Sequence, residues 1–223
     1  MRIGKQFLTI LSIVGMLSAT MAIAPAAIII SQYYEGASFD KYIELHNTGP
    51  AAVDLAAGLY NLSHWSNAAR EDWKTGGSPT GTQSLTGVIP VGGTYLVAHS
   101  SAATPAYALP ADAADGGNGG VNFNGDDSSV LWTGAAYAFA SVVDAFGATA
   151  NAFGNTSYVR NANITSGTNL DFDASQWTQF SNDDVNNAAT GTNQRLGEHS
   201  IIPEPASITL LIGCLGVMTI RRR

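Results

Sequence analysis

In the run KYIELH at residues 41–46, the aliphatic residues Ile43 and Leu45 alternate with Tyr42, Glu44 and His46. Because successive side chains of a β-strand point to opposite faces, Ile43 and Leu45 are expected to face a core. The turn-forming residues 47–50 (NTGP) follow directly and end the run. The stretch therefore predicts a short strand of a sheet with one core face. The opposite face of that strand is expected to carry Tyr42, Glu44 and His46.

Short stretches of similar character recur along the chain between clusters of Gly, Asn and Pro. No segment shows apolar residues at helical spacing over a length that would predict an amphipathic helix. Many short strands with such punctuation are typical of an antiparallel sandwich. We therefore predict an all-β fold, an immunoglobulin-like antiparallel β-sandwich. The further strands expected are residues 27–31, 53–55, 85–89, 94–98, 128–132 and 141–146.

Short segments in a defined order cover most of the middle of the chain. They are residues 28–36 (IIISQYYEG), 41–47 (KYIELHN), 53–55 (VDL), 88–98 (VIPVGGTYLVA), 123–127 (FNGDD), 142–147 (VVDAFG), 158–161 (YVRN), 175–178 (SQWT) and 196–199 (LGEH). Together they resemble a lamin-tail domain in its bacterial secreted form, over residues 27–199. The resemblance implies an immunoglobulin-like β-sandwich. The loop 61–81 has no counterpart in it, and its fold and order are left open.

The N-terminus has the three parts of a secretory signal peptide. Arg2 and Lys5 form a basic start, residues 7–22 are mostly apolar, and small residues follow. We predict a signal peptide over residues 1–26, removed by signal peptidase after Ala26 or after Ala22. The alternative is a retained N-terminal membrane anchor.

The C-terminus carries a second processing signature. Pro203-Glu204-Pro205 precedes the apolar stretch 206–220, and Arg221-Arg222-Arg223 closes the chain. As a helix the apolar stretch is about 22 Å long, shorter than the hydrocarbon core of a bilayer, but arginine snorkelling and local thinning offset the mismatch. The positive-inside rule places the arginines in the cytoplasm and the middle of the chain outside.

This order of elements at the C-terminus resembles the PEP-CTERM sorting signal, over residues 202–223. The resemblance implies a Gram-negative bacterium and export across the inner membrane. It also implies cleavage near Pro203-Glu204-Pro205 by exosortase, a membrane-embedded cysteine peptidase. The precursor would be tethered to the inner membrane, and the mature protein would reach the cell surface or the medium. An uncleaved C-terminal anchor is the alternative.

The body between the two signals is strongly acidic. Residues 27–201 hold five basic and sixteen acidic side chains, a formal charge of −11, whereas the whole chain carries −7. A nucleic-acid binder needs a basic footprint to neutralise phosphates, so nucleic acid is excluded as a partner. The single cysteine, Cys214, permits no intrachain disulfide and no cysteine-based zinc cluster.

Acidic pairs in polar, loop-like stretches are candidates for a calcium site, because calcium prefers oxygen ligands. None of them follows the spacing of an EF-hand loop. Solvated turn aspartates are the alternative, and we favour it. The candidates are Asp126, Asp127, Asp171 and Asp173, with Asp183-Asp184 as a further pair.

No catalytic motif is present in the chain, neither a zinc-binding His-Glu-x-x-His, nor a Gly-x-Ser-x-Gly elbow, nor a phosphate-binding loop. The four histidines are widely separated in sequence. We therefore predict no catalytic residues and no cofactor apart from the calcium candidate. Four aromatic residues could form a sugar-binding platform or cover a small core, and general burial tendencies favour the core. They are Tyr33, Tyr34, Trp65 and Trp73.

Taken together, these features indicate an exported, non-enzymatic protein of the cell surface or extracellular matrix. Its lamin-tail-like domain would be a binding or structural module, with extracellular polysaccharide or other surface proteins as partners. One alternative is a secreted hydrolase, because bacterial lamin-tail domains often accompany nucleases or phosphatases. Once both signals are removed, however, the sandwich takes nearly all the remaining residues, so there is no room for a separate catalytic domain. The other alternative is a calcium- or glycan-binding adhesin.

Overall fold

The computed structural model describes residues 28–103, 112–114, 119–147, 153–181, 184–185 and 188–201. These residues form twelve β-strands and four short 3-10 helices, which confirms the all-β prediction. Within the same ranges no helix has the length and apolar character needed to cross a membrane. The predicted signal peptide (1–26) and sorting signal (202–223) both lie outside the described residues.

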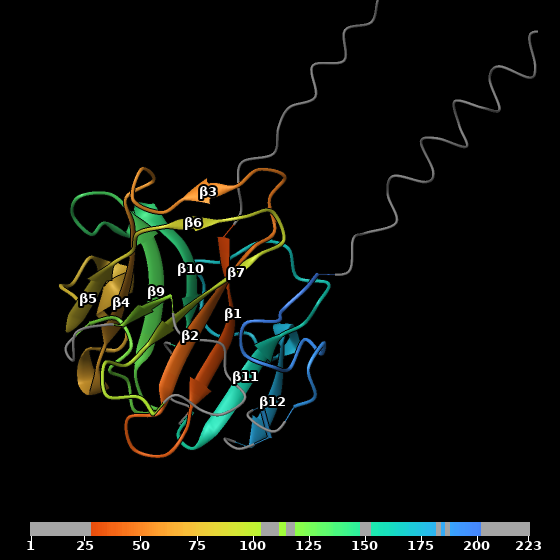
Figure 1. Ribbon diagram of the computed structural model, residues 1–223. Helices are drawn as coiled ribbons and strands as arrows, with labels where there is room; N and C mark the ends of the chain where they lie inside the picture. The colour runs from red at the N-terminus through yellow and green to blue at the C-terminus, as the bar shows by residue number, and fades with distance from the viewer. Residues whose placement is uncertain are drawn as a thin grey trace, which may run out of the picture.

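Two larger sheets and one small ribbon make up the fold (Figure 1). The six-stranded sheet has the order β12 (Trp177–Ser181), β11 (Thr156–Arg160), β1 (Ile28–Glu35), β2 (Lys41–Asn47), β7 (Thr94–Ala98) and β8 (Ala113–Ala114). The four-stranded sheet has the order β10 (Val142–Phe146), β9 (Ser128–Thr133), β4 (Tyr60–Trp65) and β5 (Gly81–Ser84). The ribbon pairs β3 (Val53–Asp54) with β6 (Val88–Ile89). Neighbouring strands are antiparallel except β7 and β8.

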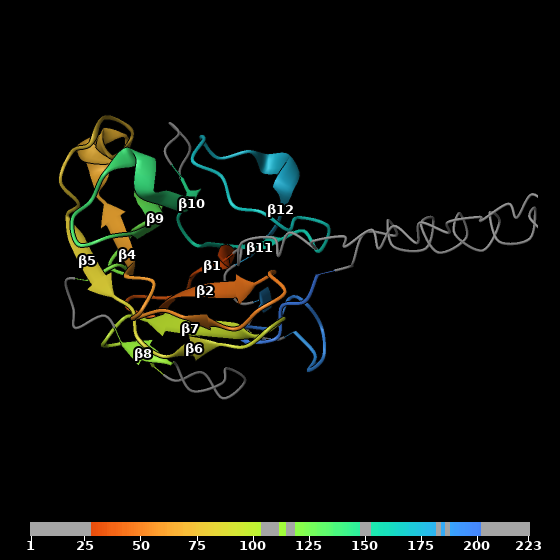
Figure 2. The same cartoon turned by 90° about the horizontal axis from the view of Figure 1, so that it is seen from above.

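Residues of the two larger sheets form one apolar core. Figure 2 shows the arrangement of these sheets from above. Ile43 and Leu45 are fully buried in this core, as the alternation in β2 predicts. The ring of Tyr33 stacks between Phe123 and Phe146, with centroid distances of 4.4 and 4.3 Å. Stacked and edge-to-face rings of this kind add to the stabilisation that comes from burial alone.

The opposite face of β2 is buried as well. Glu44 and His46 have no exposed surface, because the C-terminal segment 188–201 packs over this side of the six-stranded sheet. Leu196 of that segment belongs to a second apolar cluster that includes Tyr42. Glu44 accepts hydrogen bonds from the Ser31 hydroxyl and the Gly197 N–H. The expected single-faced sheet is therefore covered on both sides.

The loop 61–81, which the sequence left open, is ordered. It contains most of β4, the 3-10 helices η1 (Asn67–Ala69) and η2 (Asp72–Thr75), and the first residue of β5. Trp65 and Trp73 are fully buried and form a third cluster with Val130 and Ala145. Tyr33 and Tyr34 are buried too, so these four aromatic residues are core and the idea of a sugar platform made from them is wrong.

A buried ion pair joins the two larger sheets. A guanidinium nitrogen of Arg160 in β11 lies 3.3 Å from Oδ2 of Asp144 in β10, and both side chains are fully buried. Oδ2 of Asp144 also accepts a 2.8 Å hydrogen bond from the backbone N–H of Ile30 in β1. The Arg160 guanidinium lies 4.6 Å from the ring centroid of Trp177. One carboxylate thus connects three strands.

Both ends of the described body lie at the same end of the six-stranded sheet. β1 begins at Ile28, which pairs with Asn47 at the end of β2. The last described segment reaches the same place, since the rings of His199 and His46 are 5.0 Å apart. The turn between β1 and β2 lies at the other end, about 25 Å away along eight extended residues (Figure 1).

Candidate functional site

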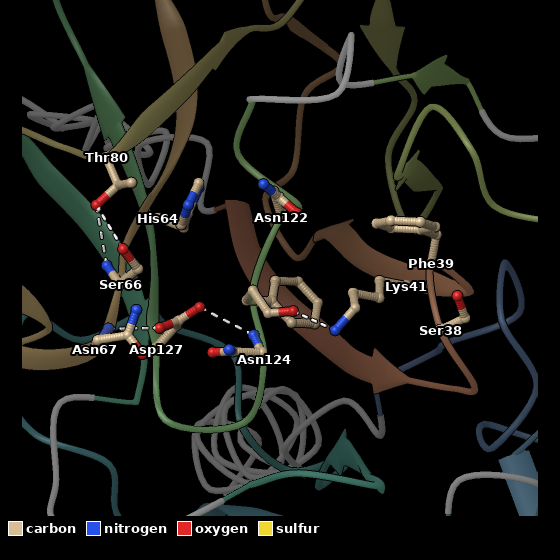
Figure 3. Close-up of a pocket in the computed structure, with 11 residues that line it drawn as sticks. Ser38, Phe39, Lys41, His64, Ser66, Asn67, Thr80, Asn122, Asn124 and Asp127 are labelled. Atoms are coloured by element: carbon tan, nitrogen blue, oxygen red, sulfur yellow. Dashed lines mark hydrogen bonds between the residues drawn. The ribbon is translucent and has the colours of Figure 1, made fainter.

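A cavity of about 430 Å³ opens at the end of the sandwich that carries the β1–β2 turn (Figure 3). Three parts of the chain meet there: the turn with Ser38 and Phe39, the end of β4 with the start of η1, and the turn that precedes β9. The cavity is lined by Ser38, Phe39, Lys41, His64, Ser66, Asn67, Thr80, Asn122, Phe123, Asn124 and Asp127.

Asp127 organises one wall of this cavity. Its side chain is almost fully buried and accepts hydrogen bonds from the backbone N–H groups of Asn67 (2.7 Å) and Asn124 (2.9 Å). Asn67 has a φ of 52°, a left-handed conformation that asparagine tolerates better than most residues. Burial raises the pKa of Asp127 above its usual value, while the two N–H donors act in the opposite direction. The carboxylate therefore ties two loops together.

Lys41 lines the opposite side of the cavity. Its ammonium group lies 3.0 Å from Oε1 of Glu35 and also donates to the carbonyl oxygen of Phe123. Glu35 in turn accepts a 3.2 Å hydrogen bond from the Tyr33 hydroxyl. Burial raises the pKa of Glu35, and the ammonium group of Lys41 partly offsets that rise. The charge of Lys41 is thus compensated within the protein.

Four other lining side chains are available to a ligand, those of Ser38, Phe39, Asn67 and Asn122. Phe39 is 51% exposed, and its ring stacks on the ring of His99, with centroids 4.7 Å apart. The side chains of Ser38, Asn67 and Asn122 make no hydrogen bond in the part of the chain that the structure describes. No sequence motif marks these positions, and the only signal is a phenylalanine within a polar turn.

His64, Ser66 and Asp127 line the same cavity, but their contacts are not those of a serine hydrolase. The Ser66 hydroxyl pairs with the Thr80 hydroxyl at 3.1 Å. Nδ1 of His64 lies 2.7 Å from the carbonyl oxygen of Gly119. A serine nucleophile requires its base within hydrogen-bond distance, and this serine is bonded to a threonine instead.

Of the calcium candidates, Asp127, Asp171 and Asp173 make contacts within the protein, and Asp183 of the further pair lies outside the described residues. The carboxylate of Asp171 pairs with Lys74. Asp173 accepts hydrogen bonds from the N–H (3.0 Å) and hydroxyl (2.7 Å) of Ser175 at the start of η4 (Ala174–Gln176), and these bonds lower its pKa. Asp126 lies next to Asp127 in the turn before β9. Across the described residues, no three His, Cys, Asp or Glu side chains lie together in a group that could hold a metal ion.

Two of the four histidines come together where the C-terminal segment meets the sheet. His46 and His199 are buried, and their ring nitrogens have no hydrogen-bond partner among the described residues. Burial lowers the pKa of His46, and burial together with His46 and Arg160 lowers the pKa of His199 to about 4. Both rings are therefore neutral at pH 7.

This pair predicts acid sensitivity. The unfolded state, with a histidine pKa near 6.5, binds a proton more readily than folded His199, so stability is lost as the pH falls from about 6.5 towards 4. Between pH 7 and pH 5 we expect the wild type to lose about 2 kcal/mol more than a His199→Phe variant, as measured by urea unfolding.

The comparison with His199→Phe is needed because Glu44 acts in the opposite direction. Burial raises the pKa of Glu44 from 4.5 to about 8, so its contribution to stability is fully present below about 4.5 and is lost as the pH rises from there to about 8. Equal pH profiles for the wild type and His199→Phe would contradict the account of the histidine pair.

Comparison with known protein families and with curated proteins finds no match for this chain. The two family resemblances therefore rest on the segments quoted above and stay predictions.

Proposed function

We propose that the protein is an exported, non-enzymatic module of the cell surface or extracellular matrix. In this proposal an immunoglobulin-like, lamin-tail-type sandwich is the binding part. A signal peptide (1–26) exports the chain, and a PEP-CTERM signal (202–223) tethers it to the inner membrane until exosortase cleaves near Pro203-Glu204-Pro205.

The observation that carries the proposal is the position of the chain ends relative to the cavity. Ile28 and His199 lie at one end of the six-stranded sheet, and the segments proposed to enter the membrane continue from that end. The cavity beside Ser38 and Phe39 lies at the other end. In the tethered precursor the cavity therefore points away from the inner membrane. Cleavage near Pro203-Glu204-Pro205 would release the body at the end opposite the cavity, so the cavity stays free to bind at the cell surface.

The contacts in the cavity support a binding role over a hydrolytic one. Its charged groups, Lys41 and Asp127, are both bonded within the protein, and among the described residues the Ser66 hydroxyl pairs with Thr80 and not with a base. The groups left for a ligand are one aromatic ring, two amides and a hydroxyl. Such groups bind by stacking and hydrogen bonding and do not activate a nucleophile.

Intact mass spectrometry of the protein from a Gram-negative host that contains exosortase tests this proposal. We expect the surface and medium fractions to hold a form that lacks residues 1–26 and the residues that follow the Pro-Glu-Pro element. A control with alanine at Pro203, Glu204 and Pro205 keeps the apolar stretch and the arginines, and should stay in the inner membrane. A wild-type protein with its full C-terminus in the inner-membrane fraction would overturn the proposed processing.

A further inference from the structure

We propose that the cavity at the β1–β2 end binds a neutral sugar unit of a polysaccharide, with Phe39 as its stacking platform. The inference deepens the proposed function, on which it rests for the statement that the cavity meets polysaccharide outside the cell. It concerns residues that the sequence analysis did not single out, and it replaces the aromatic platform that the structure shows to be buried.

The aromatic ring is held in place before any ligand arrives. Phe39 stacks on His99 at 4.7 Å with an angle of 16° between the rings, and Nδ1 of His99 accepts a 3.0 Å hydrogen bond from the Ser101 N–H. His99 is buried and does not line the cavity, whereas Phe39 does and keeps 51% of its surface exposed. One side of the ring is thus supported, and the exposed part adjoins the cavity. The C–H face of a sugar packs well on such a surface.

Polar groups around the ring match the hydroxyl groups of a sugar. The amides of Asn67 and Asn122 and the hydroxyl of Ser38 have no hydrogen-bond partner among the described residues. An amide side chain both donates and accepts, as a hydroxyl does, so these groups can serve hydroxyls in either role. Figure 3 shows Asn122 between the Asn67 side of the cavity and the Phe39 side.

The charges of the cavity favour a neutral ligand. Lys41 is bonded to Glu35 and to the Phe123 carbonyl oxygen. Its positive charge is therefore compensated within the protein and does not favour an anionic ligand. Asp127 is buried and bonded to two backbone N–H groups, so it is not free to bind a cation. The body carries a formal charge of −11 over residues 27–201, which repels acidic polymers.

The size of the cavity is also suitable. About 430 Å³ lies in the lower part of the range for small-molecule sites, roughly 300–1,000 Å³. Together with its one exposed ring, this volume fits a single sugar unit.

Affinity electrophoresis of the full chain tests the inference, with neutral polysaccharides (dextran, laminarin, galactomannan and mannan) cast in the gel. The protein is kept in a detergent without a sugar headgroup, such as lauryldimethylamine oxide, because a maltoside would compete for the cavity. We expect retardation by at least one neutral polysaccharide and none by the acidic polymer alginate. Phe39→Ala should weaken the association about tenfold and Asn122→Ala about fivefold.

Val91→Ala is the matched control, because Val91 is 58% exposed and lies in the turn before β7, at the end of the sheet opposite the cavity. It should bind like the wild type, and all three variants should keep the wild-type melting temperature to within a few degrees. Two outcomes would overturn the inference: no retardation by any neutral polysaccharide, or retardation that Phe39→Ala and Asn122→Ala leave unchanged.

The binding result and the processing result are independent. Binding is measured on the purified, uncleaved chain, so it can fail while the surface form is found by mass spectrometry. It can equally succeed while cleavage of the C-terminus is absent.

Discussion

Replacing Asp144 by alanine is expected to lower the free energy of unfolding by about 3–5 kcal/mol, because it leaves a buried guanidinium without its carboxylate. Arg160 is fully enclosed and has no route to solvent. Burial raises the pKa of Asp144 to about 6, so the carboxyl group is ionised at pH 7. The variant also leaves the N–H groups of Ile30 and Thr168 without their acceptor. Urea unfolding followed by tryptophan fluorescence measures the loss.

An exposed ion pair provides the control for this prediction. Asp171 pairs with Lys74, but its side chain is 57% exposed, so Asp171→Ala should cost less than about 1 kcal/mol. Asp144→Asn keeps an oxygen that can accept from Ile30 and should fall between the two alanine variants. If Asp144→Ala were no more destabilising than Asp171→Ala, the Arg160–Asp144 ion pair would not stabilise the contact between the two sheets.

Trp73→Ala is expected to lower the free energy of unfolding by about 3–5 kcal/mol, the usual cost of deleting a large buried aromatic ring. Trp73 has no exposed surface and packs with Trp65, Val130 and Ala145 against the outer side of the four-stranded sheet. The change should leave a cavity where η2 now covers that sheet. Thermal unfolding monitored by circular dichroism would show the loss as a lower melting temperature.

The matched control is Phe139→Ala. Phe139 is a neighbour of the Trp73 ring, with centroids 5.9 Å apart, but it is 37% exposed, so its removal should cost about 1 kcal/mol or less. Equal effects of Trp73→Ala and Phe139→Ala would mean that the segment 61–81 is not docked on the sheet as described.

The strands that the sequence predicts best are those with one apolar face and clear turn residues at their ends. β2 follows the alternation of Ile43 and Leu45, and β7 coincides with the expected range 94–98. β4 is not evident from the sequence, because its polar residues Ser63 and His64 are buried as well: Ser63 accepts a hydrogen bond from the Trp132 indole N–H, and His64 contacts the Gly119 carbonyl oxygen. A second covering layer removes the contrast between core and solvent faces on which periodicity depends.

The candidate site could be predicted only in part, for a related reason. The sequence points to Asp127 as a calcium candidate through its carboxylate, and in the structure that carboxylate joins two loops by accepting from their backbone N–H groups. Phe39, Asn67 and Asn122 are distant in sequence, and tertiary contacts alone bring them to one cavity. For Tyr33 and Trp65 the general burial tendencies favour the core over a sugar platform, and the burial of both side chains confirms this.

Labelling of single cysteines on intact cells tests the central claim most directly. In a Cys214→Ser background, Ser38→Cys places a thiol in the exposed turn beside the cavity, and Ser200→Cys places one at the end where the chain leaves the body. The account predicts that a membrane-impermeant maleimide labels both Ser38→Cys and Ser200→Cys on intact cells, because cleavage near Pro203-Glu204-Pro205 has released the body from the inner membrane. Labelling of Ser38→Cys only after lysis of the cells would contradict an exported module that presents its cavity to the outside.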